Sequence, residues 1–240
     1  MTSGKPAPIS RRERPAKPAL TREGIVEAAL EVMRAEGLGR VTMRRLAQQL
    51  DTGAASLYVY VRNTAELHAL MLDELLAGLD LSPVTAEGNW RDRLVTVLWS
   101  YVRVLTEHPE LAQSALVTRP SGPGYLNLVD GLLALLDAGV SADRASWAVD
   151  LLLHFATSTA AEQGTRQRAI DAGEEEDRLA ETIASTSAAR YPHIAALGLD
   201  LLSGPGPDRL TWGFNVLISG ILQTPRPAPV AAGTGETRHG

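Results

Sequence analysis

The side chains best suited to recognising another molecule gather between residues 41 and 64 of this 240-residue chain. Arg44 carries a guanidinium that suits base edges or phosphates, and the hydroxyls of Tyr58 and Tyr60 suit phosphate oxygens. The run Ala-Ala-Ser at 54 to 56 is small enough to let a backbone approach another surface closely. The chemistry that these groups support is hydrogen bonding and charge pairing with a nucleic acid.

Two short helices joined by a tight turn are needed to position these groups. Thr42 can cap the first helix, and its apolar residues keep the spacing of one buried stripe: Met43, Leu46, Ala47 and Leu50. Asp51 tolerates a left-handed backbone in the turn, and we expect the Thr52 hydroxyl to cap the second helix. Leu57 and Val61 then face the core. The pattern predicts a helix-turn-helix, whose slim second helix reads the major groove.

A further helix, from Thr21 to about Glu36, is expected to support the motif and complete a three-helix domain over residues 20–64. This segment resembles the DNA-binding domain of the TetR (tetracycline repressor) family. The matching positions include Thr42, Leu46-Ala47, Leu50, Leu57-Tyr58, Val61 and Asn63. The resemblance implies a DNA-binding set of Thr42, Arg44, Gly53, Ala54, Ala55, Ser56, Tyr58, Tyr60 and Thr64.

Two positions depart from the family pattern. The turn position usually held by Gly is Asp51, and the Lys that commonly begins the next helix and touches phosphate is Thr64. Without that Lys we expect one fewer ionic phosphate contact per subunit. The salt dependence of DNA binding should be correspondingly shallower, because its slope scales with the number of phosphates neutralised.

The charge distribution agrees with a DNA-binding amino-terminal part. The net charge is −5, but residues 1–64 carry a balance of +5 and the remainder a balance of −10. Residues 1–19 are rich in Pro, Lys and Arg and are predicted to form a disordered basic arm. The arm is either a solubilising tail or a segment that tracks phosphates or enters an adjacent minor groove. Residues 224–240 are predicted to be a disordered tail.

Residues 65–223 have helical periodicity throughout and predict a ligand-binding and dimerisation domain, a helical bundle, so the expected fold class is all-α. Asn63 and Glu66 resemble a capping box for a helix that runs to about Asp80. The later helices are expected at 90–107, from 109, at 125–138, at 141–168, through Ala189, at 192–202 and at 208–223. The last is apolar enough to need burial, either in its own core or against a second subunit. The resemblance implies a four-helix bundle across a two-fold axis.

No arrangement of residues predicts catalysis. The chain has no Cys, its five His are scattered, and HExxH, GxSxG and phosphate-cradling glycine loops are absent from the sequence. His154 reads as a core or pocket-wall imidazole, and an acidic run at 173–177 reads as a solvated loop and helix start. Aromatic residues of the bundle instead predict a binding cavity: Trp99, Tyr101, Tyr125, Trp147 and Phe155.

The carboxy-terminal part resembles the inducer domain of tetracycline repressors, through Trp90, Thr118-Arg119-Pro120, Gly139 and His154-Phe155. The resemblance implies a ligand-binding set of Val97, Tyr101, Ala115, Thr118, Arg119, Leu128, Gly131, Trp147 and His154. Ala115, Asp80, Val97 and Gly131 replace the His, His, Asn and Gln that hold magnesium and tetracycline in the family. Since Ala and Val cannot coordinate magnesium, we expect a different, more apolar ligand, with no metal and no cofactor.

The sequence as a whole predicts a homodimeric, cytoplasmic repressor that binds a palindromic double-stranded DNA operator and is released by a small-molecule inducer. No apolar run approaches the roughly 20 residues of a membrane span, so no membrane association is expected. Two rival hypotheses stay open, an enzyme that uses the aromatic pocket with His154 and a DNA-binding protein that responds to no ligand. Activation in place of repression also stays open, because it depends on where the operator lies.

Overall fold

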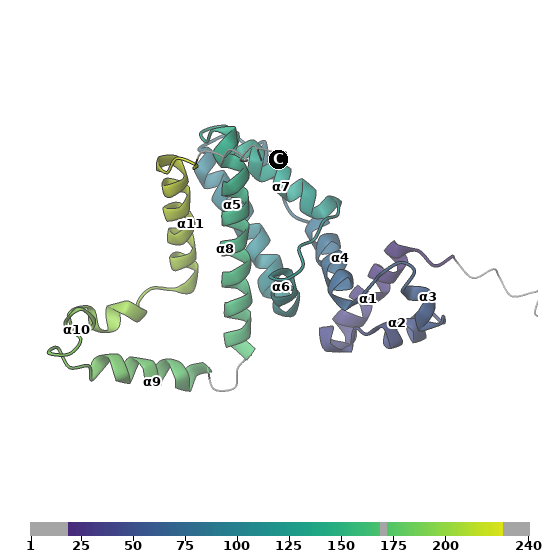
Figure 1. The fold of residues 1–240 in the computed structure, drawn as a ribbon, viewed down its shortest axis with the longest axis horizontal. Helices are drawn as coiled ribbons and strands as arrows, with labels where there is room; N and C mark the ends of the chain where they lie inside the picture. The colour runs from purple at the N-terminus through teal and green to yellow at the C-terminus, as the bar shows by residue number, and fades with distance from the viewer. Residues whose placement is uncertain (1–18, 169–171, 228–240) are drawn as a thin grey trace, which may run out of the picture. The chain divides into compact units, whose positions relative to one another are not determined.

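The computed structural model describes residues 19–168 and 172–227, and the chain divides into two compact units at residues 64 and 65 (Figure 1). Every regular element in the described residues is a helix, which confirms the all-α fold class. The basic arm expected over residues 1–19 and the tail expected over 224–240 fall almost wholly outside the described residues.

The first unit is built from α1 (Arg22–Glu36), the short η2 (Leu38–Arg40), α2 (Met43–Gln49) and α3 (Ala54–Leu57). Threonine hydroxyls cap two of these helices as predicted. Thr21 Oγ1 accepts the Gly24 N–H at 3.0 Å, and Thr42 Oγ1 accepts the Arg45 N–H at 3.1 Å. The side chains that close the core are fully buried: Ile25, Leu46, Leu57 and Val61. Burial of Leu57 and Val61 fixes which face of α3 is left for contacts.

The turn between α2 and α3 differs in part from the prediction. Asp51 adopts the expected left-handed conformation, with φ of 48°. The expected cap by Thr52 is wrong, because Gly53 occupies the N-cap position and α3 has no side-chain cap. The helix is a single turn, and residues 58–60 continue in a turn conformation, so both tyrosines extend from the end of α3.

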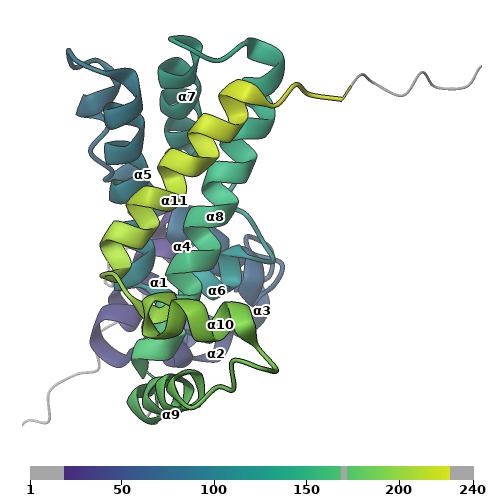
Figure 2. The same cartoon turned by 90° about the vertical axis from the view of Figure 1, so that its left-hand side faces the viewer.

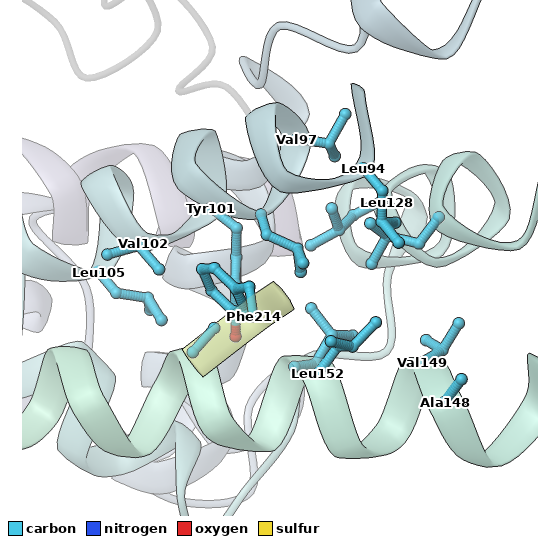
Figure 3. Packing of buried hydrophobic residues seen from close by; sticks show 14 of the residues in the cluster. Leu94, Val97, Tyr101, Val102, Leu105, Leu128, Ala148, Val149, Leu152 and Phe214 are labelled. Atoms are coloured by element: carbon cyan, nitrogen blue, oxygen red, sulfur yellow. The ribbon is translucent and has the colours of Figure 1, made fainter. Parts of the chain in front are cut away.

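In the second unit α5 and α8 form the centre, with α6, α7 and α11 packed against them (Figures 1 and 2). The elements after the first unit are α4 (Thr64–Ala77), η3 (Ser82–Val84), α5 (Trp90–Glu107), α6 (Pro109–Ala115), α7 (Pro123–Asp137), α8 (Ala142–Arg168), α9 (Ala172–Ala184), α10 (Pro192–Leu197), η4 (Gly198–Leu202) and α11 (Gly206–Gln223). Figure 3 shows Phe214 of α11 beside Tyr101 of α5 and facing Leu152 of α8. Phe214 is fully buried and meets Phe155 edge-on, with ring centroids 5.5 Å apart.

Two helices end earlier than expected, and near each end a polar side chain forms a hydrogen bond with a backbone group. The helix expected to reach Asp80 ends at Ala77, and the Asp80 carboxylate instead accepts the Ser82 N–H at 2.9 Å. The helix expected to reach Ala189 ends at Ala184, where the Thr186 hydroxyl donates to the Thr182 carbonyl at 2.8 Å.

The stretch from α9 to η4 buries none of its described side chains. Its apolar side chains are exposed: Leu179, Tyr191, Ile194, Leu197, Leu199 and Leu201. Figure 2 shows α9 and α10 below the ends of α8 and α11. This stretch therefore contributes little to the core of its own chain.

Candidate functional site

The predicted DNA-contacting side chains lie on the exposed surface of the first unit. Eight of the nine are exposed and Ala54 is half-buried. Arg44 projects from α2 and forms no hydrogen bond or ion pair with any described residue, which leaves its guanidinium free for a ligand. Tyr58 and Tyr60 are 52% and 38% exposed at the end of α3. Polar groups therefore flank a helix end whose own residues are small.

The neighbouring Arg45 is used within the unit. Its guanidinium donates to the Glu36 carboxylate, at 2.6 Å from Nη2 and 3.0 Å from Nε, and to Gln49 Oε1 at 3.1 Å from Nη1. The hydrogen bond from Arg45 lowers the pKa of Glu36 below its ordinary value. Two adjacent arginines on α2 thus have different roles: Arg45 ties α2 to the end of α1, and Arg44 points away from the unit.

Val59 is a surface residue that the sequence reasoning missed. It lies between the two tyrosines and is 81% exposed. Its position follows from the burial of Leu57 and Val61 on either side of it in the chain. An exposed valine between the two tyrosines can pack against the methyl group of thymine.

In the second unit a small cavity lies among α5, α6, α7 and α8, and three of the residues around it are exposed: Leu116, Arg119 and His154. It is lined by Tyr101, Ala115, Leu116, Arg119, Pro120, Tyr125, Leu153, His154 and Thr157. Its volume is about 30 Å³, whereas a drug-sized ligand needs roughly 300–1,000 Å³. Four of the predicted ligand residues meet here, namely Tyr101, Ala115, Arg119 and His154, and the cavity must open before it can hold a ligand.

A buried hydroxyl pair forms the inner wall of the cavity. The Thr157 hydroxyl donates to the Leu153 carbonyl at 2.7 Å, so the Tyr101 hydroxyl must be the donor to Thr157 Oγ1 at 2.9 Å. Burial raises the pKa of Tyr101 to about 12. Tyr101 therefore stays a neutral phenol at physiological pH, with oxygen lone pairs left to accept a hydrogen bond.

An exposed ion pair forms the outer wall. Arg119 Nη1 lies 2.5 Å from Asp150 Oδ1, with the two side chains 59% and 57% exposed. The hydrogen bond that Arg119 donates to Asp150 raises the pKa of Arg119, and burial raises the pKa of the nearby Tyr125. A pair this exposed contributes at most about 1 kcal/mol, so a ligand oxygen can replace Asp150 at small cost.

The structure places the other predicted ligand residues elsewhere. Val97 and Leu128 are fully buried in the core, and Thr118 is half-buried outside the cavity lining. Gly131 faces η3, where an added Cβ would lie 3.0 Å from Val84 Cγ2. These four residues pack around the cavity and do not line it. Five lining residues were not in that set. Tyr125 of α7 was among the aromatic residues expected at a cavity, and Leu153 and Thr157 lie on α8, whereas Leu116 and Pro120 follow α6 where no periodic pattern could have revealed them.

Trp147 does not lie at this cavity, which corrects the prediction. It is 54% exposed, in a groove of about 400 Å³ between α8 and α11, with the Arg226 guanidinium 4.4 Å from its ring centroid. Trp147 and His154 share a helix face because seven residues make two turns, but that separation is about 10 Å along the axis. The same face of α8 and α11 also exposes Leu151, Trp212 and Val216.

Comparison with known families identifies both units. The family described as "Bacterial regulatory proteins, tetR family" matches residues 25–70, and "Tetracyclin repressor-like, C-terminal domain" matches residues 82–224. The chain belongs to the TetR family. The TetR-family resemblance inferred from the motifs is thereby confirmed.

Individual TetR-family proteins are similar over most of this chain. The HTH-type transcriptional repressor DrrR1 of Streptomyces coeruleorubidus is 29% identical over 218 residues, covering 88% of this chain and 80% of that protein. A Streptomyces protein whose structure is described as that of a transcription regulator is 50% identical, with a TM-score of 0.77 over 89% of this chain and all of that one. ActR of Streptomyces coelicolor in complex with actinorhodin is 33% identical, with a TM-score of 0.74 over 85% and 96% of the two chains.

This TetR-family chain is a transcription regulator with a DNA-binding helix-turn-helix domain, and its relatives are regulators and not enzymes. Within residues 19–168 and 172–227, no helix is both long and apolar enough to cross a membrane. The same residues contain no group of three or more His, Asp or Glu that could hold a metal ion.

Proposed function

We propose that this TetR-family regulator binds a short palindromic operator as a homodimer, represses transcription there and is released by a small molecule. The observation that carries the proposal is the exposed Arg44 on α2, which has no side-chain partner among the described residues, together with the exposed tyrosines that extend from the end of α3. Arg44 has the geometry to read a base edge, and Tyr58 and Tyr60 have hydroxyls for the phosphates on either side. Repression is the activity named for the similar DrrR1.

The homodimer accounts for the exposed apolar face of α8 and α11. Trp147, Leu151, Trp212 and Val216 are each at least 44% exposed, on two helices that otherwise contribute Leu152 and Phe214 to the core. A second copy that packs the same face would bury these side chains and bring two recognition helices into one molecule. Two such helices about 34–36 Å apart enter successive major grooves.

The inducer is an aromatic, largely apolar compound that carries hydroxyl or carbonyl oxygens. The Tyr101 hydroxyl and the Arg119 guanidinium provide polar contacts at opposite sides of the cavity, and Leu116, Pro120 and Leu153 provide apolar walls. Val97 and Ala115 offer no atom that coordinates magnesium, so the ligand is bound without a metal. The complex of the similar ActR with actinorhodin supports this choice of compound class.

Release follows from the small volume of the cavity. A ligand enters only a form in which the 30 Å³ cavity has widened, so it binds the widened form more tightly and shifts the population toward it. If widening displaces α4, the spacing of the recognition helices changes and the operator is lost. A ligand that bound both forms equally would shift nothing.

The test is a selection of bound duplexes from a random DNA pool, followed by sedimentation of the protein alone and on the selected duplex. A palindrome with half-sites about one helical turn apart, bound by two copies, is expected. Actinorhodin and other aromatic compounds that carry hydroxyl or carbonyl oxygens are then titrated against the complex, and saturable release is expected. Recovery of no preferred sequence would overturn the operator proposal, and an operator that no tested aromatic compound releases would overturn the ligand class.

A further inference from the structure

A buried carboxylate of α4 holds the amino-terminal end of α7. Asp73 is 7% exposed, and its partners among the described residues are backbone groups: it accepts the Tyr125 N–H at 2.9 Å and the Gly124 N–H at 3.3 Å. A buried carboxylate needs such partners, since an unpartnered charge in the interior is strongly unfavourable. Asp73 therefore caps a helix that belongs to a different part of the chain.

The local sequence is suited to this contact. Helix α7 has Gly122 at its N-cap and Pro123 at its first position, so no side chain of its own caps it. A Cβ on Gly122 would clash with the Asp73 carboxylate, and a Cβ on Gly124 would clash with the Asp73 carbonyl. Only residues without side chains let α4 and α7 approach this closely.

The capped end of α7 is also a wall of the small cavity. The segment 115–125 provides Ala115, Leu116, Arg119, Pro120 and Tyr125 to the lining. Its outer side faces solvent, with Val117 87% exposed. The opposite wall is packed into the core, where Tyr101 is 2% exposed and Thr157 is 7% exposed. Widening the cavity therefore displaces segment 115–125 more easily than α5 or α8.

We propose that Asp73 is the positioning residue that makes α4 follow segment 115–125 when the cavity widens. This inference rests on the proposed ligand-controlled operator binding. Because the Asp73 carboxylate holds two N–H groups of α7, a shift of that helix end draws α4 with it. Helix α4 begins at Thr64, where the first unit ends, so the displacement reaches the chain that leads into the DNA-binding domain. The contact of His68 Nδ1 with Ser114 Oγ at 3.3 Å is a second link from α4, to the residue of α6 that precedes this segment.

The experiment uses a side chain in place of a ligand to widen the cavity. Ala115→Phe puts an aromatic ring into a cavity of about 30 Å³, and operator affinity is measured with the duplex recovered by selection. The substitution is made in the wild-type chain, in Asp73→Asn and in Glu74→Gln. Glu74 is the exposed neighbour of Asp73 on α4 and loses the same charge, so it is the matched control.

We expect Ala115→Phe to weaken operator binding by about tenfold or more in the wild-type and Glu74→Gln backgrounds, and by less than about threefold with Asp73→Asn. Asp73→Asn by itself should keep operator affinity within about threefold, because it weakens the link by replacing one acceptor oxygen with an NH2 donor and leaves the DNA contacts in place. Asp73→Ala, which removes both acceptors, should reduce the coupling at least as far. If Ala115→Phe does not fold by circular dichroism, Ala115→Leu takes its place.

The outcomes separate this inference from the proposed function. Equal weakening by the Phe in all three backgrounds would show that Asp73 only stabilises the fold, which overturns the inference and leaves ligand-controlled repression intact. An absence of weakening in the wild-type background would overturn the link between the cavity and α4 altogether. A wild-type chain that selects no duplex would overturn the proposed function before any variant is made.

Discussion

Replacing Thr64 by Lys should make operator binding more sensitive to salt. Thr64 is exposed and is the first residue of α4, and the amino-terminal end of a helix favours a phosphate. A Lys at this position adds one ionic phosphate contact per subunit. For two subunits, the slope of log affinity against log salt should steepen by about 1.8, at about 0.9 per phosphate.

The assay is fluorescence anisotropy of a labelled operator duplex over a range of salt concentrations. A fourfold rise in salt, from about 50 to 200 mM, should cost the variant about twelvefold more affinity than it costs the wild type. Thr182→Lys makes the same substitution on α9 and is the control, because Thr182 is exposed in the other unit. Its slope should match that of the wild type.

A Thr64→Lys slope that agrees with the wild-type slope within about 0.5 would refute the reasoning. It would mean that no phosphate lies within reach of residue 64, and that the start of α4 has been placed wrongly on the DNA. Equal steepening with Thr182→Lys would also contradict the prediction, because the effect would then be one of net charge.

Three further predictions follow from single side chains. Arg44→Ala should relax base preference at one operator position by roughly 1–3 kcal/mol. Arg45→Ala should lower the midpoint of thermal unfolding and leave the base preference unchanged. Selection of bound duplexes and thermal unfolding of each variant check both results, and the reverse result would exchange the roles of the two arginines. Phe214→Ala should lower the free energy of unfolding by about 3–5 kcal/mol in urea titrations, since it empties a fully buried site, and a loss below about 1 kcal/mol would contradict that packing. Burial lowers the pKa of His68 below its ordinary value of 6.5, so the unfolded chain binds the proton first, and stability should rise with pH up to about 6.5 and then level off. Comparing wild type with His68→Gln from about pH 5 to 8 isolates this term, and identical pH profiles would exclude it.

The sequence predicted the helix-turn-helix closely because local signals decide it. Thr21 and Thr42 cap helices through contacts three residues away, and the spacing of Leu46, Leu57 and Val61 sets the buried face. Thr52 was predicted wrongly as a cap because a hydroxyl and a glycine at neighbouring positions compete for one site. In the structure Gly53 occupies the N-cap position of α3.

The ligand cavity was less predictable because it is made by distant parts of the chain. Periodicity shows which face of the 27-residue α8 a residue occupies, but not which part of that face lines the cavity. Trp147 lies on the same face as His154, and was therefore assigned to the cavity although it lies in a different groove. Segment 116–120 lies between helices and has no repeating pattern. Asp73 gave no signal either, since one acidic residue in an amphipathic helix normally faces solvent, and its partners are two backbone groups about 50 residues later.

The small volume of the cavity sets how fast such a regulator can respond. A compound that arrives at a cavity of about 30 Å³ must wait for segment 115–125 to move, so its observed association rate levels off at the opening rate as its concentration rises. Compounds of different affinity would then share one maximal entry rate and differ in residence time. The delay between exposure to an inducer and release of the operator becomes a property of the chain, and substitution of the exposed Val117, which does not line the cavity, would change it without changing which compounds bind.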